Sequence, residues 1–273
     1  MRPGTRGEMR KMKWIQTAFA LFAFVFLAQP SFATDGMTNI DAGRNGATIP
    51  IFVLENPTAT KTLILLPGGG GESGKIILGQ PGSNNFLSRS RDLFQAQGFN
   101  VIVMYRASDL DDLDTEYRTT KPHISEIERV IKFAKQEFKK PVWLIGTSRG
   151  TVSATAASIA LGASAVSGLV LTSSVTDARR NGIGSLAVDQ LKIPVLIVHH
   201  QNDQCKICVP AEAAKVIDQL KSSPVKKFIE IDGGSNPTGD HCGESHWHGY
   251  INYEPETVKI ITDWIKHPIK DAK

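Results

Sequence analysis

The chain has 273 residues, with 31 lysines and arginines against 27 aspartates and glutamates. Five of the basic residues and one acid lie within the first 33 positions, so residues 34–273 carry 26 of each sign and are formally neutral. A neutral chain of about 240 residues can bury the core of one sizeable domain, and it offers no basic surface for nucleic acid.

Residues 1–33 have the pattern of a secretory signal peptide. A basic start that ends at Lys13 is followed by an apolar run from Ile15 to Ala28 and by small residues at Ser31 and Ala33. The apolar run is short for a membrane span. We therefore predict cleavage after Ala33, export without stable membrane insertion, and a single domain over residues 34–273; an uncleaved anchor is the alternative.

Downstream of this segment, strand and helix patterns alternate, after a polar, turn-rich stretch over residues 39–51. The predicted strands are Ile51–Leu54 at an edge, Lys61–Leu66, Asn100–Tyr105, Val142–Ile145, Ser167–Ser174, Pro194–His199 and Lys227–Ile231. The predicted helices are Asn85–Gly98, Ile124–Lys139, a small-residue helix after Ser148, and Pro255–Lys266. Mostly apolar strands that alternate with helices indicate a largely parallel sheet covered on both faces.

The chemistry-bearing pattern is Gly146-Thr147-Ser148-Arg149-Gly150, which lies between a buried strand and a helix rich in small residues. A serine on a sharp strand-to-helix turn, with glycines two residues to either side, is typical of a nucleophile elbow. The alternative, Ser148 as a simple helix N-cap, explains the serine and leaves the two glycines unexplained. We therefore predict that Ser148 is a nucleophile.

A serine nucleophile needs a base, and the base needs an orienting carboxylate. Asp203 follows the strand that ends at His199, and it is our candidate acid; a turn-forming aspartate is the alternative. Three histidines of one late loop compete for the role of base. We favour His248 over His246, and His246 over His241, because His248 leads directly into the terminal helix.

An oxyanion hole needs backbone N–H groups that point at one position. Arg149 follows the nucleophile directly, and a run of glycines follows the strand that ends at Leu66. Gly69, with Gly70 as the alternate, suits this task because a residue without a side chain lets the backbone approach a substrate closely.

Together these elements resemble the α/β-hydrolase superfamily, specifically its small lidless members of the dienelactone-hydrolase kind, over residues 50–266. The resemblance implies a three-layer fold without a cap domain. It also implies a carboxylesterase-like serine hydrolase (class 3.1) that takes a small acyl substrate, needs no cofactor or metal, and cleaves a carboxylic ester, thioester or lactone. In this family pattern Ser148 is the nucleophile, Asp203 the acid and His248 the base, with oxyanion donors at Gly69 and Arg149.

Two departures limit what the resemblance carries over. The strand-end His-Gly that is common in the superfamily is Pro67-Gly68 here. Dienelactone hydrolases proper also use a cysteine where this chain has Ser148, so their substrate is not carried over. The segment of residues 176–192, where lids usually enter, is too short for a cap, which predicts an open site for small or extended acyl groups.

The three cysteines are Cys205, Cys208 and Cys242. We predict a Cys205–Cys242 disulfide that ties the loop of the acid to the loop of the base, with Cys208–Cys242 as the alternative pairing. A rival function is a redox or metal-binding exported protein on a hydrolase scaffold, built on these cysteines and nearby histidines. A second rival is a phosphate-binding loop from Gly69 to Lys75, although Ile76 replaces the usual serine or threonine.

Overall fold

The computed structural model describes residues 35–77 and 80–268, together with residues 1, 3 and 4. The predicted targeting segment over residues 1–33 therefore lies almost wholly outside the described residues. Among the helices that are described, none is long and apolar enough to cross a membrane.

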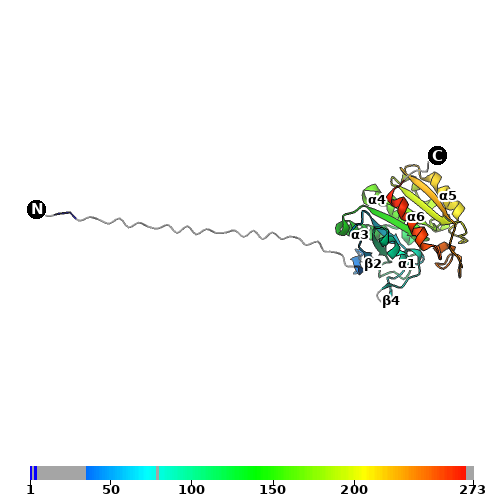
Figure 1. Cartoon of the computed structure of the whole chain (residues 1–273), viewed down its shortest axis with the longest axis horizontal. Helices are drawn as coiled ribbons and strands as arrows, with labels where there is room; N and C mark the ends of the chain where they lie inside the picture. Colours follow the sequence, from blue (N-terminus) through cyan, green and yellow to red (C-terminus); the bar gives the residue numbers. More distant parts are fainter. Residues whose placement is uncertain (2, 5–34, 78–79, 269–273) are drawn as a thin grey trace. The chain divides into compact units, whose positions relative to one another are not determined.

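The described domain is built on a sheet of eight strands in the order β1-β2-β6-β3-β7-β8-β9-β10. Figure 1 shows this sheet among the helices of the domain. The strands are β1 (Gly36–Asp41), β2 (Thr48–Leu54), β3 (Thr62–Leu66), β6 (Asn100–Met104), β7 (Val142–Thr147), β8 (Gly168–Thr172), β9 (Val195–His200) and β10 (Lys226–Ile231). Strand β2 runs antiparallel to β1 and β6, and all the other neighbours are parallel. The parallel strands therefore end at one common edge of the sheet.

Helices cover both faces of this sheet, as predicted. Helices α3 (Lys121–Phe138), α4 (Gly150–Ala165) and α5 (Pro210–Gln219) contribute side chains to one apolar cluster, and α1 (Phe86–Arg89), α2 (Arg91–Ala96) and α6 (Glu254–Lys266) to the other. Strand β3 serves both clusters alternately: Ile64 and Leu66 face the first, and Leu63 and Leu65 the second. This alternation within a wholly apolar strand is the signature of a sheet buried on both faces.

Two expectations at the start of the domain were wrong. The stretch expected to be turn-rich, residues 39–51, contains the end of strand β1 and the start of β2, and β2 is therefore an inner strand rather than the edge. Strand β1 was missed because most of its side chains are exposed or half-buried, so it lacks an apolar pattern. Backbone pairing with β2 holds it in place, and pairing of this kind leaves no trace in composition.

The helices also depart from the predicted boundaries. The single helix expected over residues 85–98 breaks at Ser90 into α1 and α2. Helix α3 starts at Lys121 rather than Ile124, directly after a 3-10 turn at Tyr117–Thr119. Helix α5, whose first residue is Pro210, was not predicted. Proline favours the first turn of a helix, so a signal for its start was present.

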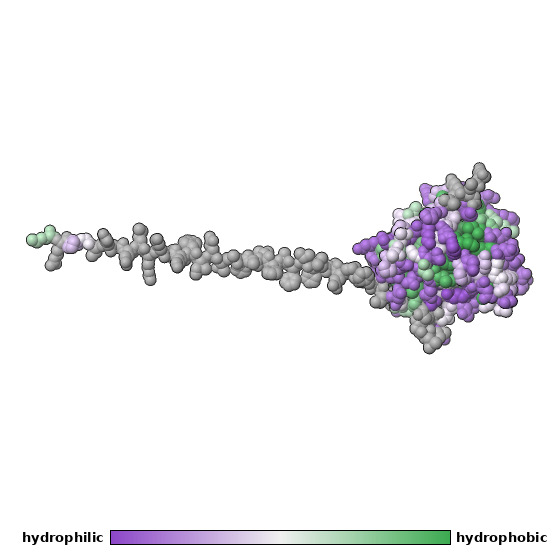
Figure 2. Space-filling model, viewed as in Figure 1, coloured by the Kyte–Doolittle hydropathy of each residue, from purple (hydrophilic) through white to green (hydrophobic). Residues whose placement is uncertain are grey.

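The segment expected to be too short for a cap contains only three 3-10 turns, Ala178–Arg180, Ile183–Ser185 and Val188–Gln190. Two further short strands, β4 (Ile76–Ile77) and β5 (Gln80–Pro81), pair with each other beside the glycine run. In the space-filling view, hydrophilic residues cover most of the visible face and apolar residues gather in small groups between them (Figure 2). The predicted acidic loop follows this pattern, because Asp111, Asp112, Asp114 and Glu116 are exposed.

Candidate active site

Ser148 occupies the corner between β7 and α4. Its φ is 52°, in the left-handed region that non-glycine residues rarely adopt. Its N–H donates to the carbonyl oxygen of Thr172 (3.0 Å), and its own carbonyl accepts from Thr151 N–H (3.0 Å), so both flanking elements fix the turn. A strained backbone of this kind costs about 1–3 kcal/mol and is concentrated at functional sites. The local geometry is that of a nucleophile elbow.

The two glycines of the motif are needed for close packing. A Cβ atom on Gly150 would overlap the carbonyl oxygen of Leu66, and one on Gly146 would overlap the carbonyl of Gly150. Helix α4 can therefore approach β3 and β7 closely only because these two positions lack side chains. The strand-to-helix turn is consequently sharp, and it holds Ser148 at the carboxyl end of the parallel strands.

Asp203 and His248 form a buried pair at the same edge of the sheet. His248 Nδ1 lies 2.9 Å from Asp203 Oδ2, and the two residues are 5% and 7% exposed. The other carboxylate oxygen, Oδ1, accepts the N–H of Cys205 (2.9 Å). With Nδ1 facing a carboxylate oxygen, the favoured tautomer of the neutral imidazole has its proton on Nδ1 and its lone pair on Nε2. In the described part of the chain, Nε2 has no hydrogen-bond partner.

The loop that carries His248 is anchored to the sheet edge on both sides of the histidine. The Ser173 hydroxyl donates to the His248 carbonyl (2.8 Å), and the Tyr250 hydroxyl donates to the carbonyl of Val198 (2.9 Å). Arg89 donates to the Gly249 carbonyl (2.6 Å) and pairs with Glu254 (2.7 Å). These hydrogen bonds fix the backbone on both sides of His248 and so fix the orientation of its side chain. The Arg89 guanidinium is used in this structural role.

The two competing histidines of this loop lie elsewhere. His246 packs against His241, with ring centroids 4.8 Å apart, and neither makes a hydrogen bond to Asp203 among the described residues. Burial lowers the pKa of His246, and the neighbouring His241 lowers it further. His199 lies at the end of β9, where its Nε2 accepts the Ser174 N–H (2.7 Å). Burial lowers the pKa of His199 to about 3.

Ser148 and His248 line one cavity of about 40 Å³. Its other lining residues are Gly69, Asn85, Phe86, Thr147, Glu244 and Gly249. Ser148 and His248 are not hydrogen-bonded to each other in this structure; the Cys208 thiol lies within 4.8 Å of a ring nitrogen of His248. Burial raises the pKa of that thiol well above its usual value, so Cys208 is held as a neutral group.

The three backbone N–H groups predicted for an oxyanion hole belong to Gly69, Gly70 and Arg149. Within the described residues, none of the three donates to a protein acceptor, although the neighbouring Gly71 N–H donates to the Gly68 carbonyl (3.0 Å). Backbone amide groups that have no protein acceptor are free to bind a negatively charged oxygen. The Arg149 side chain turns away toward Asp112, at 3.9 Å.

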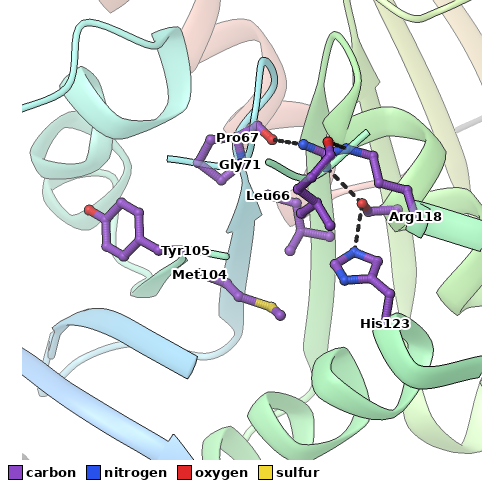
Figure 3. Close-up of a pocket in the computed structure, with 9 residues that line it drawn as sticks. Leu66, Pro67, Gly71, Met104, Tyr105, Arg118 and His123 are labelled. Carbon is purple, nitrogen blue, oxygen red and sulfur yellow. Dashed lines mark hydrogen bonds between the residues drawn. The ribbon is translucent and has the colours of Figure 1, made fainter. Parts of the chain in front are cut away.

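The Arg118 side chain binds backbone carbonyls of the glycine-rich loop after β3, an arrangement that the sequence did not reveal; Figure 3 shows its contact with Pro67. Its guanidinium donates to the carbonyls of Leu113 (3.0 Å), Gly69 (3.1 Å) and Pro67 (3.4 Å). Burial lowers the pKa of Arg118 to about 9, so it remains charged near neutral pH. In the sequence Arg118 resembled an ordinary surface arginine, but only 1% of it is exposed.

A second serine–histidine–acid set lies behind Arg118. Arg118 donates to Ser153 Oγ (2.8 Å), Ser153 Oγ lies 2.8 Å from His123 Nε2, and His123 Nδ1 lies 2.8 Å from Glu126 Oε2. All three members of the set are buried, and the cavity beside them measures only about 10 Å³. Because a substrate cannot reach Ser153, this set is structural. It offers a matched control for Ser148.

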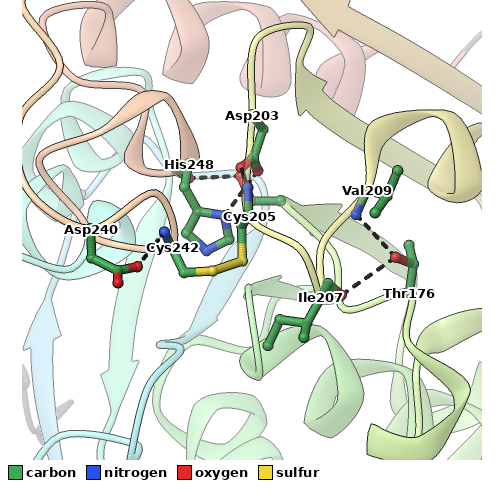
Figure 4. The surroundings of a disulfide bond; sticks show 9 residues. Thr176, Asp203, Cys205, Ile207, Val209, Asp240, Cys242 and His248 are labelled. Atoms are coloured by element: carbon green, nitrogen blue, oxygen red, sulfur yellow. Dashed lines mark hydrogen bonds and ion pairs between the residues drawn. A yellow bond between two sulfur atoms is a disulfide. The ribbon is translucent and has the colours of Figure 1, made fainter.

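The predicted Cys205–Cys242 disulfide is present (Figure 4). Cys208 is a buried free thiol. The bond joins the loop of Asp203 to the loop of His248 across 37 residues. In the loop-entropy view, a closure of that size stabilises the fold by about 3–5 kcal/mol. The phosphate-loop alternative was wrong, because the short strand β4 follows Lys75 where that motif requires a helix.

Comparisons with known proteins support the fold. No protein-family model and no curated protein matches the sequence. Among solved structures, a lidless α/β serine hydrolase from Xanthomonas campestris is 13% identical, covers 90% of this chain and 100% of its own, and has a TM-score of 0.58. Est1E from Butyrivibrio proteoclasticus is 17% identical over 85% of this chain and 98% of its own (TM-score 0.58).

A dienelactone hydrolase from Anabaena variabilis is 14% identical over 86% of this chain and 97% of its own (TM-score 0.61). Because these identities are low, the comparisons show the fold alone. The sheet order, the two helical layers and the missing cap match the α/β-hydrolase fold, and the fold class predicted from the sequence is confirmed.

Proposed function

We propose that this protein is a serine hydrolase that cleaves an ester-type bond, in a carboxylic ester, thioester or lactone, through an acyl-enzyme on Ser148. The observation that carries the proposal is that a backbone-strained serine and a carboxylate-oriented histidine from a loop 100 residues away line the same cavity. A left-handed backbone at a non-glycine residue is a strain that is concentrated at functional sites, and a free Nε2 is what a general base needs.

In the proposed acylation step, Ser148 Oγ attacks the substrate carbonyl carbon and its proton passes to His248 Nε2. Because Ser148 and His248 line the same cavity, rotation of the serine side chain brings its hydroxyl toward Nε2. Asp203 keeps the other imidazole nitrogen protonated and stabilises the imidazolium that forms. His248 then gives the proton to the leaving group, and the carbonyl reforms as an acyl ester of Ser148.

The negative charge that develops on the carbonyl oxygen is proposed to lie against the N–H groups of Arg149 and Gly69, with Gly70 as the alternate. Their lack of protein acceptors among the described residues supports this role. The positive end of α4 adds to the stabilisation. Deacylation repeats the same steps, with water as the nucleophile and His248 as the base that takes its proton.

The cavity beside Ser148 limits the acyl group. Its volume is about 40 Å³, with the Phe86 ring and the Asn85 side chain in its wall. With no cap over the site in the described chain, the leaving group is free to extend into solvent. The geometry therefore favours short acyl groups, of the size of acetyl or propionyl, with wide tolerance for the leaving group.

The pairing of the cysteines bears on two proposals: export of the protein, and the rival redox function. A disulfide suits an oxidising compartment, which supports our proposal that residues 1–33 direct export. The dithiol redox alternative requires Cys205 and Cys208 to pair with each other. In this structure Cys205 is bonded to Cys242 instead, so the hydrolase is the proposal with more support.

Initial rates on p-nitrophenyl esters of increasing acyl length test the proposal. We expect turnover of the acetyl ester to exceed that of the octanoyl ester, S148A to lose turnover, and the matched variant S153A to retain it. A preference for long acyl chains would refute the assignment of the cavity. Equal loss in S148A and S153A would refute Ser148 as the nucleophile.

A further inference from the structure

One thiol of the chain takes no part in the proposed chemistry, yet it lies at the centre of the site. Ligand atoms of Cys205, Cys208 and His248 all lie within 4.8 Å of one another, and all three residues are buried. His248 Nε2 has no partner within the described chain, because Nδ1 is taken by Asp203. Cys242, whose sulfur is bonded to that of Cys205, is exposed and lies outside this cluster in the oxidised protein.

We propose that reduction of the Cys205–Cys242 disulfide creates a site for a thiophilic divalent cation such as Zn²⁺. Its donors are the thiolates of Cys205, Cys208 and Cys242 together with His248 Nε2. Three sulfurs and one imidazole in a tetrahedron are a standard structural zinc site, and the two-residue spacing between Cys205 and Cys208 is typical of such sites. In the oxidised protein the disulfide withholds two of the four donors.

The distances fit this coordination. Zinc bonds of 2.0–2.3 Å in a tetrahedron place ligand atoms about 3.5–3.8 Å from one another. The three clustered atoms are within 4.8 Å, so they need to close by up to about 1.3 Å, and the Cys242 sulfur has to turn into the cluster once the disulfide is open. Side-chain rotation is sufficient for a movement of that size.

The loop that presents the cysteines is already ordered for this task (Figure 4). Cys208 N–H donates to the Cys205 carbonyl (2.9 Å), which makes a tight turn with both sulfurs inward. Thr176 holds that turn from the far side, since its N–H donates to the Ile207 carbonyl (2.8 Å) and its hydroxyl accepts Val209 N–H (3.0 Å). A fixed turn lowers the entropy lost on binding.

The histidine is oriented as a metal ligand would be. In zinc proteins a ligating imidazole commonly donates its second N–H to a carboxylate, which fixes the tautomer and strengthens the ligand. The 2.9 Å bond from His248 Nδ1 to Asp203 Oδ2 supplies this contact. The same bond that prepares His248 to act as a base also prepares it to bind a cation, so the two uses compete for Nε2.

A phosphine reductant gives two electrons, water supplies two protons and the oxygen of the phosphine oxide, and the disulfide becomes two thiols. Binding of Zn²⁺ to three thiols and one imidazole then releases three protons. With Nε2 occupied, His248 no longer takes the proton of Ser148. This inhibition rests on the proposed function, whereas the binding of the cation does not.

Cobalt(II) titration of the full-length protein tests the site independently of turnover. The phosphine-reduced, desalted wild type is expected to show tetrahedral visible bands and a thiolate charge-transfer band, and the oxidised protein neither. C208S in the reduced state should bind cobalt at least about 10–100-fold more weakly, the range for loss of even a supporting contact. Reduced wild type without these bands, or reduced C208S with wild-type affinity, overturns the proposal.

Two further readouts keep the result interpretable. If reduction unfolds the chain, cobalt should restore the ordered circular dichroism of wild type and not that of C208S; failure to restore it in wild type counts against the site. Zn²⁺ should abolish ester turnover only in the reduced protein. Thiolate bands without loss of turnover would support the cation site and refute His248 as the base. Loss of turnover without thiolate bands would place the metal elsewhere and overturn the site.

Discussion

Replacement of Arg118 by methionine tests whether its guanidinium supports the loop of Pro67 and Gly69, which we propose as part of the oxyanion hole. Arg118→Met keeps much of the side-chain length and removes every donor. The carbonyls of Pro67, Gly69 and Leu113 then lose the guanidinium that they share. A buried acceptor left unpaired costs about 1–3 kcal/mol. Three such acceptors give a loss of at least about 3 kcal/mol in the free energy of unfolding.

The catalytic effect should be separable from this loss. Removal of a whole oxyanion donor costs about 10²–10³-fold in kcat. In Arg118→Met the amide groups remain and only their support is lost, so we expect kcat to fall about 10–100-fold with little change in KM. Denaturant titration measures the first effect, and steady-state kinetics on a short-chain ester, under conditions where the variant is folded, measure the second.

Ser153→Ala is the matched control. It removes one hydrogen bond to Arg118 and one to His123 but leaves the contacts between Arg118 and the loop. We expect it to lose about 1–3 kcal/mol of stability and to keep its kcat. If Arg118→Met were destabilised to the expected extent yet turned over at the wild-type rate, Arg118 would be a packing residue, and the inferred support of the oxyanion loop would be wrong.

Two other predictions concern the imidazoles. Asp203→Asn keeps the shape of the acid but favours the wrong tautomer of His248, so kcat should fall on the order of 10⁴-fold; a loss below tenfold would exclude Asp203 as the orienting acid. Burial lowers the pKa of His199 to about 3, whereas the unfolded chain binds that proton near pH 6.5. The unfolding free energy should therefore fall below about pH 6.5, by up to about 1.4 kcal/mol per pH unit, and denaturant titrations of wild type and His199→Gln should show a steeper loss in wild type. If the unfolding free energy fell equally steeply with decreasing pH in wild type and in His199→Gln, His199 would not be the cause of the acid destabilisation.

The fold could be predicted because short stretches of the sequence are enough to indicate most of its strands and helices. Each inner strand is a short apolar run that ends in a turn, and the Gly-x-Ser-x-Gly corner carries its own backbone constraint around Ser148. Strand β1 escaped prediction because its exposed side chains carry no apolar period. The break at Ser90 also escaped, since the periodicity of residues 85–98 continues across it.

The site was predictable where a residue follows a strand end, and unpredictable where distant segments meet. Asp203 directly follows β9, so its place at the sheet edge could be inferred. The roles of Arg118 and Ser153 depend on contacts between the acidic loop, the glycine run and α4, and no single segment shows them. The closeness of the Cys208 thiol to His248 is likewise visible only in three dimensions.

Covalent labelling with a fluorophosphonate, followed by peptide mass analysis, tests the central claim most directly. The account predicts one adduct per chain on the peptide that contains Ser148, its loss in S148A, and its full retention in S153A. Labelling that persists in S148A, or a wild-type protein that stays unmodified under conditions where it is folded, would contradict it.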